Sequence, residues 1–142
     1  MKTTVLKSNQ VKRSWHKIDL KDQILGRVAT QLAFHLMGKN KPLTSPNLDN
    51  GDFVIAINAD NIKVTGKKLE QKLYQRHSGF PGGFKEFTLK EMMSRDSRKV
   101  IEHAVKGMLP KNKLRRPRMR RLKVYIDSKH PYEDQLKTKK VK

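Results

Sequence analysis

The sequence contains no cysteine. This absence excludes disulfide bonds and metal sites built on thiolate ligands. The five histidines are far apart and have no cluster of carboxylates beside them. They lie at His16, His35, His77, His103 and His130. We therefore expect no bound metal ion and no cofactor.

Long apolar runs are also missing, because no stretch approaches the ~20 apolar residues of a membrane span. Residues 1–15 are basic and lack the apolar core of a secretory signal. We therefore expect a cytoplasmic protein with no membrane partner.

Acidic residues are scarce. The chain of 142 residues has 33 Lys and Arg against 13 Asp and Glu, which leaves a formal net charge of +20. Solubility alone needs a net charge of only ~2–8 in a small domain. A larger excess repels itself in the folded state unless a polyanion neutralises it. The composition therefore predicts a nucleic-acid partner ahead of an anionic membrane.

Catalytic arrangements are absent as well. Ser78 follows His77, but adjacent residues of a strand point to opposite faces, so this pair is not a nucleophile with its base. Residues 65–68, Thr-Gly-Lys-Lys, lack the spacing of a phosphate-binding loop and are better interpreted as a basic turn. We expect no catalytic residue and no enzyme.

The apolar residues that are present fall into short periodic segments. Residues 15–19 alternate as a strand does, and residues 25–36 carry an apolar stripe at helical spacing, with Gly38 as the cap. Residues 53–57 are continuously apolar, which favours a parallel strand covered on both faces. Strand, helix, connection and strand together predict a right-handed βαβ unit.

The second half of the chain gives weaker patterns. We expect short strands over 62–64, 72–78 and 122–126, a helix capped by Thr88, and a second helix that starts at Ser97. Residues 111–121 are expected to be helical, with Pro117 interrupting or restarting the helix. Residues 1–14 are interpreted as a basic arm, 15–126 as one α/β RNA-binding domain, and 127–142 as a polar tail that becomes ordered only on a partner.

The densest basic segment follows Pro110 and contains no acid. A solvated helix face usually mixes charge signs to form i to i+4 pairs, and this segment cannot do so. Arg guanidinium groups match phosphate oxygens, so we predict that the segment binds RNA. Its candidate residues are Lys111, Lys113, Arg115, Arg116, Arg118, Arg120, Arg121 and Lys123.

A glycine-rich loop with flanking aromatic and basic residues is the second candidate. Its glycines would let the backbone approach a sugar-phosphate chain, although an ordinary loop between elements explains them equally well. The candidates are Tyr74, Arg76, His77, Ser78, Gly79, Gly82, Gly83 and Lys85. Lysines of the other basic segments complete the predicted RNA-binding set: Lys39, Lys41, Lys67, Lys68, Lys72 and Lys106. Gly26, at a helix start, could hold a phosphate, but we favour close helix–strand packing.

An ordered series of motifs extends along nearly the whole chain. It runs from Trp15 and Asp19 through Leu-Gly-Arg-Val-Ala at 25–29, Gly-Asp at 51–52 and Thr-Gly-Lys at 65–67. It continues with His-Ser-Gly-Phe-Pro-Gly-Gly at 77–83, Ala-Val-Lys-Gly-Met-Leu-Pro-Lys at 104–111 and His-Pro at 130–131. In this series the chain resembles the bacterial-type family of large-subunit ribosomal protein thirteen.

The resemblance implies a three-layer α/β/α fold around a mostly parallel four-stranded sheet. It also implies a structural constituent of the large ribosomal subunit that binds large-subunit ribosomal RNA and supports early subunit assembly. Neighbouring large-subunit ribosomal proteins would be further partners, and we expect no homo-oligomer. The family's RNA-facing features would map onto the loop at 77–83 and the segment after Pro110. The chain departs from the family at Leu114, where Arg115 and Arg116 follow instead of Gly-Arg, and near the C-terminus, where Ile126-Asp127 and Tyr132 replace the usual residues.

Two other functions are compatible with the same basic composition. A free RNA-binding regulatory protein, such as a repressor of its own mRNA, would bind RNA away from the ribosome. An RNA-modifying enzyme would need a cofactor pocket or a placed general base, and the sequence has the pattern of neither.

Overall fold

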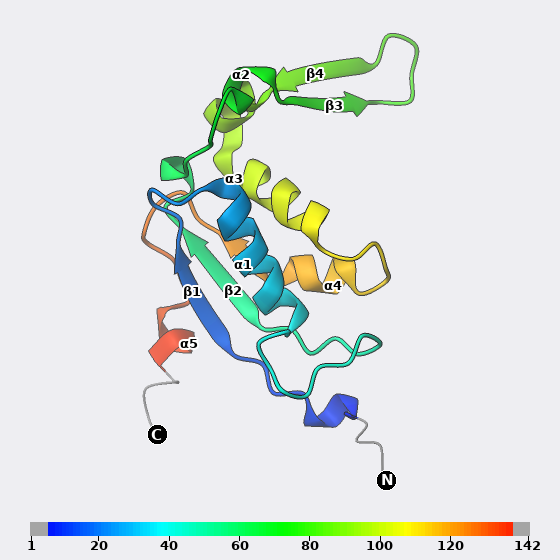
Figure 1. Cartoon of the computed structure of the whole chain (residues 1–142), viewed down its shortest axis with the longest axis vertical. Helices are drawn as coiled ribbons and strands as arrows, with labels where there is room; N and C mark the ends of the chain where they lie inside the picture. The colour runs from blue at the N-terminus through cyan, green and yellow to red at the C-terminus, as the bar shows by residue number, and fades with distance from the viewer. Residues whose placement is uncertain (1–5, 138–142) are drawn as a thin grey trace.

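A parallel sheet of three strands forms the centre of the computed structural model, which describes residues 6–137. The strands lie in the order β1 (Trp15–Asp19), β2 (Phe53–Ile57) and β5 (Leu122–Val124). Trp15 lies opposite Phe53 and Asp19 opposite Ile57. Helices α1 (Leu25–Met37) and α3 (Leu89–Met108) pack against each other and against this sheet (Figure 1). The α/β class is therefore confirmed.

The apolar stripe of α1 supplies much of the core. Val28, Leu32 and Leu36 are almost fully buried. Gly38 ends the helix with a φ of +74°, a left-handed conformation that costs glycine little. The helix and its glycine cap are both confirmed. Gly26 is not a packing glycine, because a Cβ atom there would meet nothing within 4 Å.

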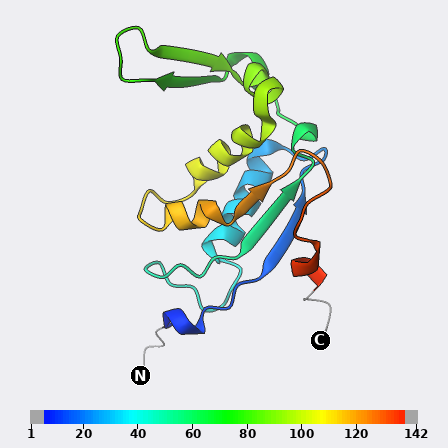
Figure 2. The same ribbon diagram turned by 180° about the vertical axis from the view of Figure 1, so that it is seen from behind.

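Strand β2 is covered on both faces, as its continuous apolar sequence predicts. Val54 and Ala56 belong to the core beneath α1 and α3, and Ile55, which alternation places on the other face, is also fully buried. The chain segment after β5 returns over that second face (Figure 2). There Tyr132 stacks on Trp15 with 5.0 Å between ring centroids, and the short helix α5 (Glu133–Lys137) contacts β1. The segment as far as Lys137 therefore packs within the chain, although we expected it to become ordered only on a partner.

A separate antiparallel hairpin projects from one end of the body (Figure 1). It consists of β3 (Leu73–His77) and β4 (Phe84–Thr88) and follows the one-turn helix α2 (Lys68–Gln71). Residues 62–64, the expected extra strand, make only the single parallel bridge between Ile24 and Lys63. The four-stranded sheet is therefore not confirmed. The three-layer arrangement is not confirmed either, since among the described residues only the segment with α5 lies on the second face.

Helix α3 has a kink at Asp96, whose φ and ψ of −164° and 96° are not helical. Thr88 caps the first half in a reciprocal pair of hydrogen bonds with Glu91, and the Asp96 carboxylate accepts from the Arg98 backbone N–H at the start of the second half. The two helices expected from the sequence are thus the two halves of α3. The remaining elements are the 3-10 turns Ser8–Gln10 and Ala59–Asn61 and helix α4 (Arg115–Arg120). Pro117 lies in the first turn of α4, where its missing N–H breaks no helical hydrogen bond.

Candidate nucleic-acid interface

Most of the candidate residues in and beside the glycine-rich loop lie in the hairpin, and most of them are exposed. Arg76, His77, Ser78 and Lys85 are exposed, and Tyr74 is buried at the base of the hairpin. Antiparallel pairing places Arg76 directly opposite Lys85 and Tyr74 directly opposite Phe87. All four of these side chains share one face of the hairpin, because residues two apart on a strand point the same way. The hairpin therefore presents a cationic pair with an aromatic pair behind it.

Local geometry accounts for the glycines of the loop. Gly79 and Gly82 have φ values of +87° and +70°. A Cβ atom on Gly83 would lie 1.9 Å from the Ser78 hydroxyl oxygen. These three positions therefore require glycine for the turn itself, and backbone approach to RNA stays a prediction.

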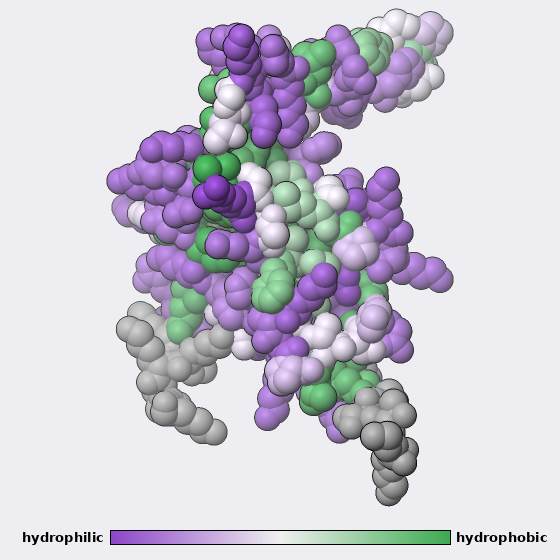
Figure 3. Space-filling view, in the orientation of Figure 1, coloured by the Kyte–Doolittle hydropathy of each residue, from purple (hydrophilic) through white to green (hydrophobic). Residues whose placement is uncertain are grey.

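Three predicted lysines, Lys67, Lys68 and Lys72, lie around α2 at the base of the hairpin, and all three are exposed. The Lys72 ammonium lies 5.2 Å from the centroid of the Tyr74 ring. These lysines extend the positive surface of the hairpin toward the body of the molecule, and Figure 3 shows hydrophilic side chains over this end.

The last turn of α3, helix α4 and the loop between them form a second basic surface. Lys106, Lys111, Lys113, Arg116 and Arg120 are exposed there, and this group of five is called the α4 surface below. The half-buried Arg115 side chain donates through Nε to the Lys106 carbonyl oxygen at 3.0 Å. In both ribbon views this end of the molecule and the hairpin extend to the same side (Figures 1 and 2).

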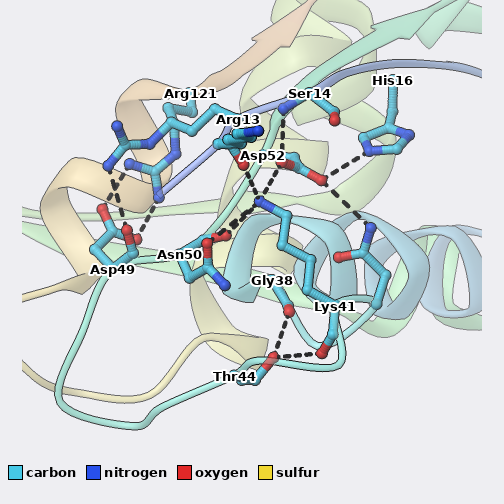
Figure 4. A network of polar contacts seen from close by, with 12 residues as sticks. Arg13, Ser14, His16, Gly38, Lys41, Thr44, Asp49, Asn50, Asp52 and Arg121 are labelled. Atoms are coloured by element: carbon cyan, nitrogen blue, oxygen red, sulfur yellow. Dashed lines mark hydrogen bonds and ion pairs between the residues drawn. The ribbon is translucent and has the colours of Figure 1, made fainter. Parts of the chain in front are cut away.

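Arg118 and Arg121 differ from the other arginines, because both are buried and both are paired with Asp49. Arg121 donates to the two Asp49 carboxylate oxygens at 2.6 and 2.5 Å (Figure 4). Arg118 Nε lies 3.6 Å from Oδ1 of the same carboxylate. Burial alone would raise the pKa of Asp49, but the Arg121 hydrogen bonds and charge lower it overall. The structure therefore does not support RNA contact through these two guanidinium groups, which hold α4 against the connection before β2.

Lys41 is occupied in a similar way by Asp52, a carboxylate that is fully buried at the start of β2. The Lys41 ammonium lies 2.7 Å from Asp52, which also accepts from the Ser14 backbone N–H at 2.8 Å and lies 2.9 Å from His16 Nε2 (Figure 4). Burial opposes ionisation, but these hydrogen bonds lower the pKa of Asp52 to about 2. The network joins residues 13–16 to the connection between α1 and β2. Of the other two predicted lysines, Lys39 is exposed and Lys123 is half-buried within β5.

Comparison with known proteins gives one family. The family model described as ribosomal protein L13 matches residues 13–131. The large ribosomal subunit protein uL13 of Thermosipho africanus is 54% identical over 134 residues, covering 94% of this chain and 90% of that protein. The uL13 protein of Roseiflexus sp. strain RS-1 is 50% identical over 135 residues, covering 95% and 92% of the two chains. The chain belongs to the ribosomal protein L13 family. The resemblance found in the motifs is therefore confirmed.

Within this L13-family chain, sequence reasoning missed the basic stripe of α3. Arg95, Lys99 and His103 follow one another at four-residue spacing, and helical geometry places Lys99 and His103 on one side of the second half of α3, after the kink at Asp96. They line a groove of about 710 Å³ between α3 and the hairpin. The four-residue spacing of these basic residues could have been found in the sequence. Nothing in the sequence of α3, however, indicated that the hairpin would lie beside this helix and form a groove with it.

Two features are absent from residues 6–137, the part of the chain that the structure describes. No group of three or more metal-ligating side chains occurs there. No helix in that range is long and apolar enough to cross a membrane.

Proposed function

We propose that this protein is a structural constituent of the large ribosomal subunit that binds large-subunit ribosomal RNA and supports early assembly of the subunit. The observation that carries the proposal is membership of the ribosomal protein L13 family over residues 13–131. The net charge of +20 supports it independently, since folded RNA is a polyanion that neutralises such an excess. The family also supports a role without catalysis, in the ribosome of the cytoplasm.

Binding would use two groups of exposed cations at the two ends of α3. The first is the hairpin with the lysines around α2, and the second is the α4 surface. Phosphate contacts of this kind set affinity and orientation and carry little base specificity. Recognition would then depend on the shape of the RNA, as is usual for RNA helices and their junctions.

Two paired aspartates, Asp49 and Asp52, would hold these surfaces in place before RNA arrives. Asp49 fixes α4 to the connection before β2, and Asp52 fixes the segment from Ser14 to His16 to the same connection. A protein with its cations already positioned loses less conformational entropy on binding. A domain whose cations are already positioned can bind RNA early in subunit assembly. Neighbouring ribosomal proteins would bind later, and the proposal requires no homo-oligomer.

Sedimentation of a tagged copy from cell lysate tests the proposal. We expect stoichiometric migration with the large subunit through a sucrose gradient, retained after a high-salt wash. Migration at the top of the gradient, or release at modest salt, would contradict a structural role and favour the free RNA-binding regulator that represses its own mRNA.

A further inference from the structure

The groove between the hairpin and α3 has one cationic and one aromatic part. Arg76 and Lys85 from the hairpin and Arg95 and Lys99 from α3 line it together. The one acidic side chain among the described residues that line it is Asp96, and both of its carboxylate oxygens already accept from Arg98, at 2.9 and 3.2 Å. Four cations therefore face one space without a carboxylate available to neutralise them.

The pairing of the strands makes this arrangement costly for the free protein. Like charges directly opposite one another on one face of an antiparallel pair are destabilising, and Arg76 and Lys85 are such a pair. On the other face, the equivalent position holds Gln75 and Glu86, which share a hydrogen bond of 2.6 Å. The two faces of the hairpin thus differ, and the like-charged pair lies on the face toward α3.

Aromatic rings form the inner part of the same groove. The Arg95 guanidinium lies 4.2 Å from the centroid of the Phe87 ring, and the rings of Tyr74 and His103 meet edge to face at 5.2 Å. Tyr74 is nine-tenths buried there, and its hydroxyl has no hydrogen-bond partner among the described residues. An aromatic ring with a guanidinium plane beside it is a surface on which nucleobases stack.

We propose that this groove binds an unpaired stretch of ribosomal RNA, with phosphates on the four cations and a base stacked against Phe87 and Arg95. The volume of about 710 Å³ lies in the range of small-ligand sites, so one or two nucleotides fit. Stacking on Phe87 or Arg95 needs a base with a free face, which an unpaired base has and a base inside a duplex does not. The inference rests on the proposed function and adds the class of RNA that this surface selects.

The test measures binding of the full chain to two labelled RNAs by fluorescence anisotropy. One probe is a single-stranded oligouridylate of about eight nucleotides, and the other is an RNA duplex of about 16 base pairs. Phe87→Leu keeps an apolar side chain but removes the stacking face. Phe84→Leu is the matched control, because Phe84 is an exposed phenylalanine of the same strand that does not line the groove.

We expect F87L to weaken single-strand binding about tenfold and to leave duplex binding unchanged, whereas F84L changes neither by more than about twofold. A second pair uses charge. Lys99→Gln should flatten the salt dependence of single-strand binding by about 0.7 in log–log slope, and Lys90→Gln, on the same helix outside the groove, should change it less. Circular dichroism melts verify that all four variants fold.

Equal effects of F87L and F84L, or equal loss of single-strand and duplex binding in F87L, would overturn the groove proposal. Either result leaves the ribosomal function intact if the wild-type chain still migrates with the large subunit. Failure of that migration would instead contradict the proposed function itself, whatever the variants bind.

Discussion

Among single residues, Asp49 and Asp52 determine which cations of the chain remain at the surface. Asp49 pairs with Arg121, which lies 72 residues later in the chain. Asp52 binds both Lys41 of its own connection and His16 of β1. Removing one partner of a buried ion pair leaves an uncompensated charge, which typically costs ~3–5 kcal/mol. Asp49 and Asp52 therefore stabilise the fold, although the chain has only 13 acidic residues.

The depressed pKa of Asp52 predicts how stability depends on pH. Its ordinary value of 3.8 falls to about 2 in the folded chain, so the stabilisation of about 2 kcal/mol is complete above pH 4 and is lost as the pH falls toward 2. Asp52→Asn should lower the free energy of unfolding by roughly 3 kcal/mol at neutral pH and reduce the further loss between pH 4 and 2. Urea denaturation at a series of pH values measures both effects.

Asp22→Asn is the control, because Asp22 forms an exposed pair with Lys63 and should change stability little. If the wild type and D52N lost stability in parallel between pH 4 and 2, Asp52 would not be the group that titrates there.

Tyr74 gives a second prediction at this scale. Its buried hydroxyl has no partner among the described residues, and an unsatisfied polar group of this kind is unfavourable. Tyr74→Phe should therefore raise the free energy of unfolding of the unbound chain by up to about 1 kcal/mol. Thermal melts of the wild type and Y74F measure this difference. A clear loss of stability in Y74F would mean that the hydroxyl is hydrogen-bonded in the free protein.

At the scale of elements, α4 separates two kinds of arginine by helical position. Arg118 and Arg121, three residues apart, face inward to Asp49, whereas Arg116 and Arg120, four apart, face outward. Their composition alone suggested one uniform RNA-binding segment. The difference depends on Asp49, which lies 72 residues before Arg121 and is invisible to any local pattern.

Two double variants that each remove two positive charges test this division. Arg116→Gln with Arg120→Gln should leave the melting temperature unchanged and flatten the log–log salt dependence of RNA binding by about 1.5. Arg118→Gln with Arg121→Gln should instead lower stability by about 3 kcal/mol, because the half-buried Asp49 carboxylate loses both of its buried arginine partners. Equal effects of the two pairs on the salt slope would refute the assignment of Arg118 and Arg121 to the interior.

The elements themselves were predictable where their signal was local. Alternation at 15–19, the stripe and glycine of α1, the continuous apolar run of β2 and the break before Ser97 each depend on neighbouring residues only. The hairpin was harder. Residues 72–78 were predicted to form a strand, but their pairing with 84–88 across the glycine loop was not predicted, and the resemblance implied a four-stranded main sheet without this separate hairpin. The groove depends on that hairpin lying over α3, a tertiary contact that no periodicity encodes.

For the whole molecule, the charge of +20 was the most informative property of the sequence. It predicts a polyanionic partner without indicating where the cations lie. In the structure the hairpin, the surroundings of α2 and the α4 surface each carry exposed cations, whereas Lys41, Arg118 and Arg121 pair with aspartates inside the molecule. A small core stabilised by internal ion pairs thus supports two basic surfaces.

The most direct measurement uses the absence of cysteine. A single cysteine introduced as Pro81→Cys at the hairpin tip, or as Lys113→Cys beside α4, can carry an iron chelate that cleaves RNA nearby, and the wild-type chain supplies the background because it cannot be labelled. In purified large subunits we expect strong cleavage of large-subunit ribosomal RNA from both positions, at two separate sets of nucleotides. Cleavage no stronger than background from both positions would contradict the central claim that these two surfaces hold the protein on ribosomal RNA.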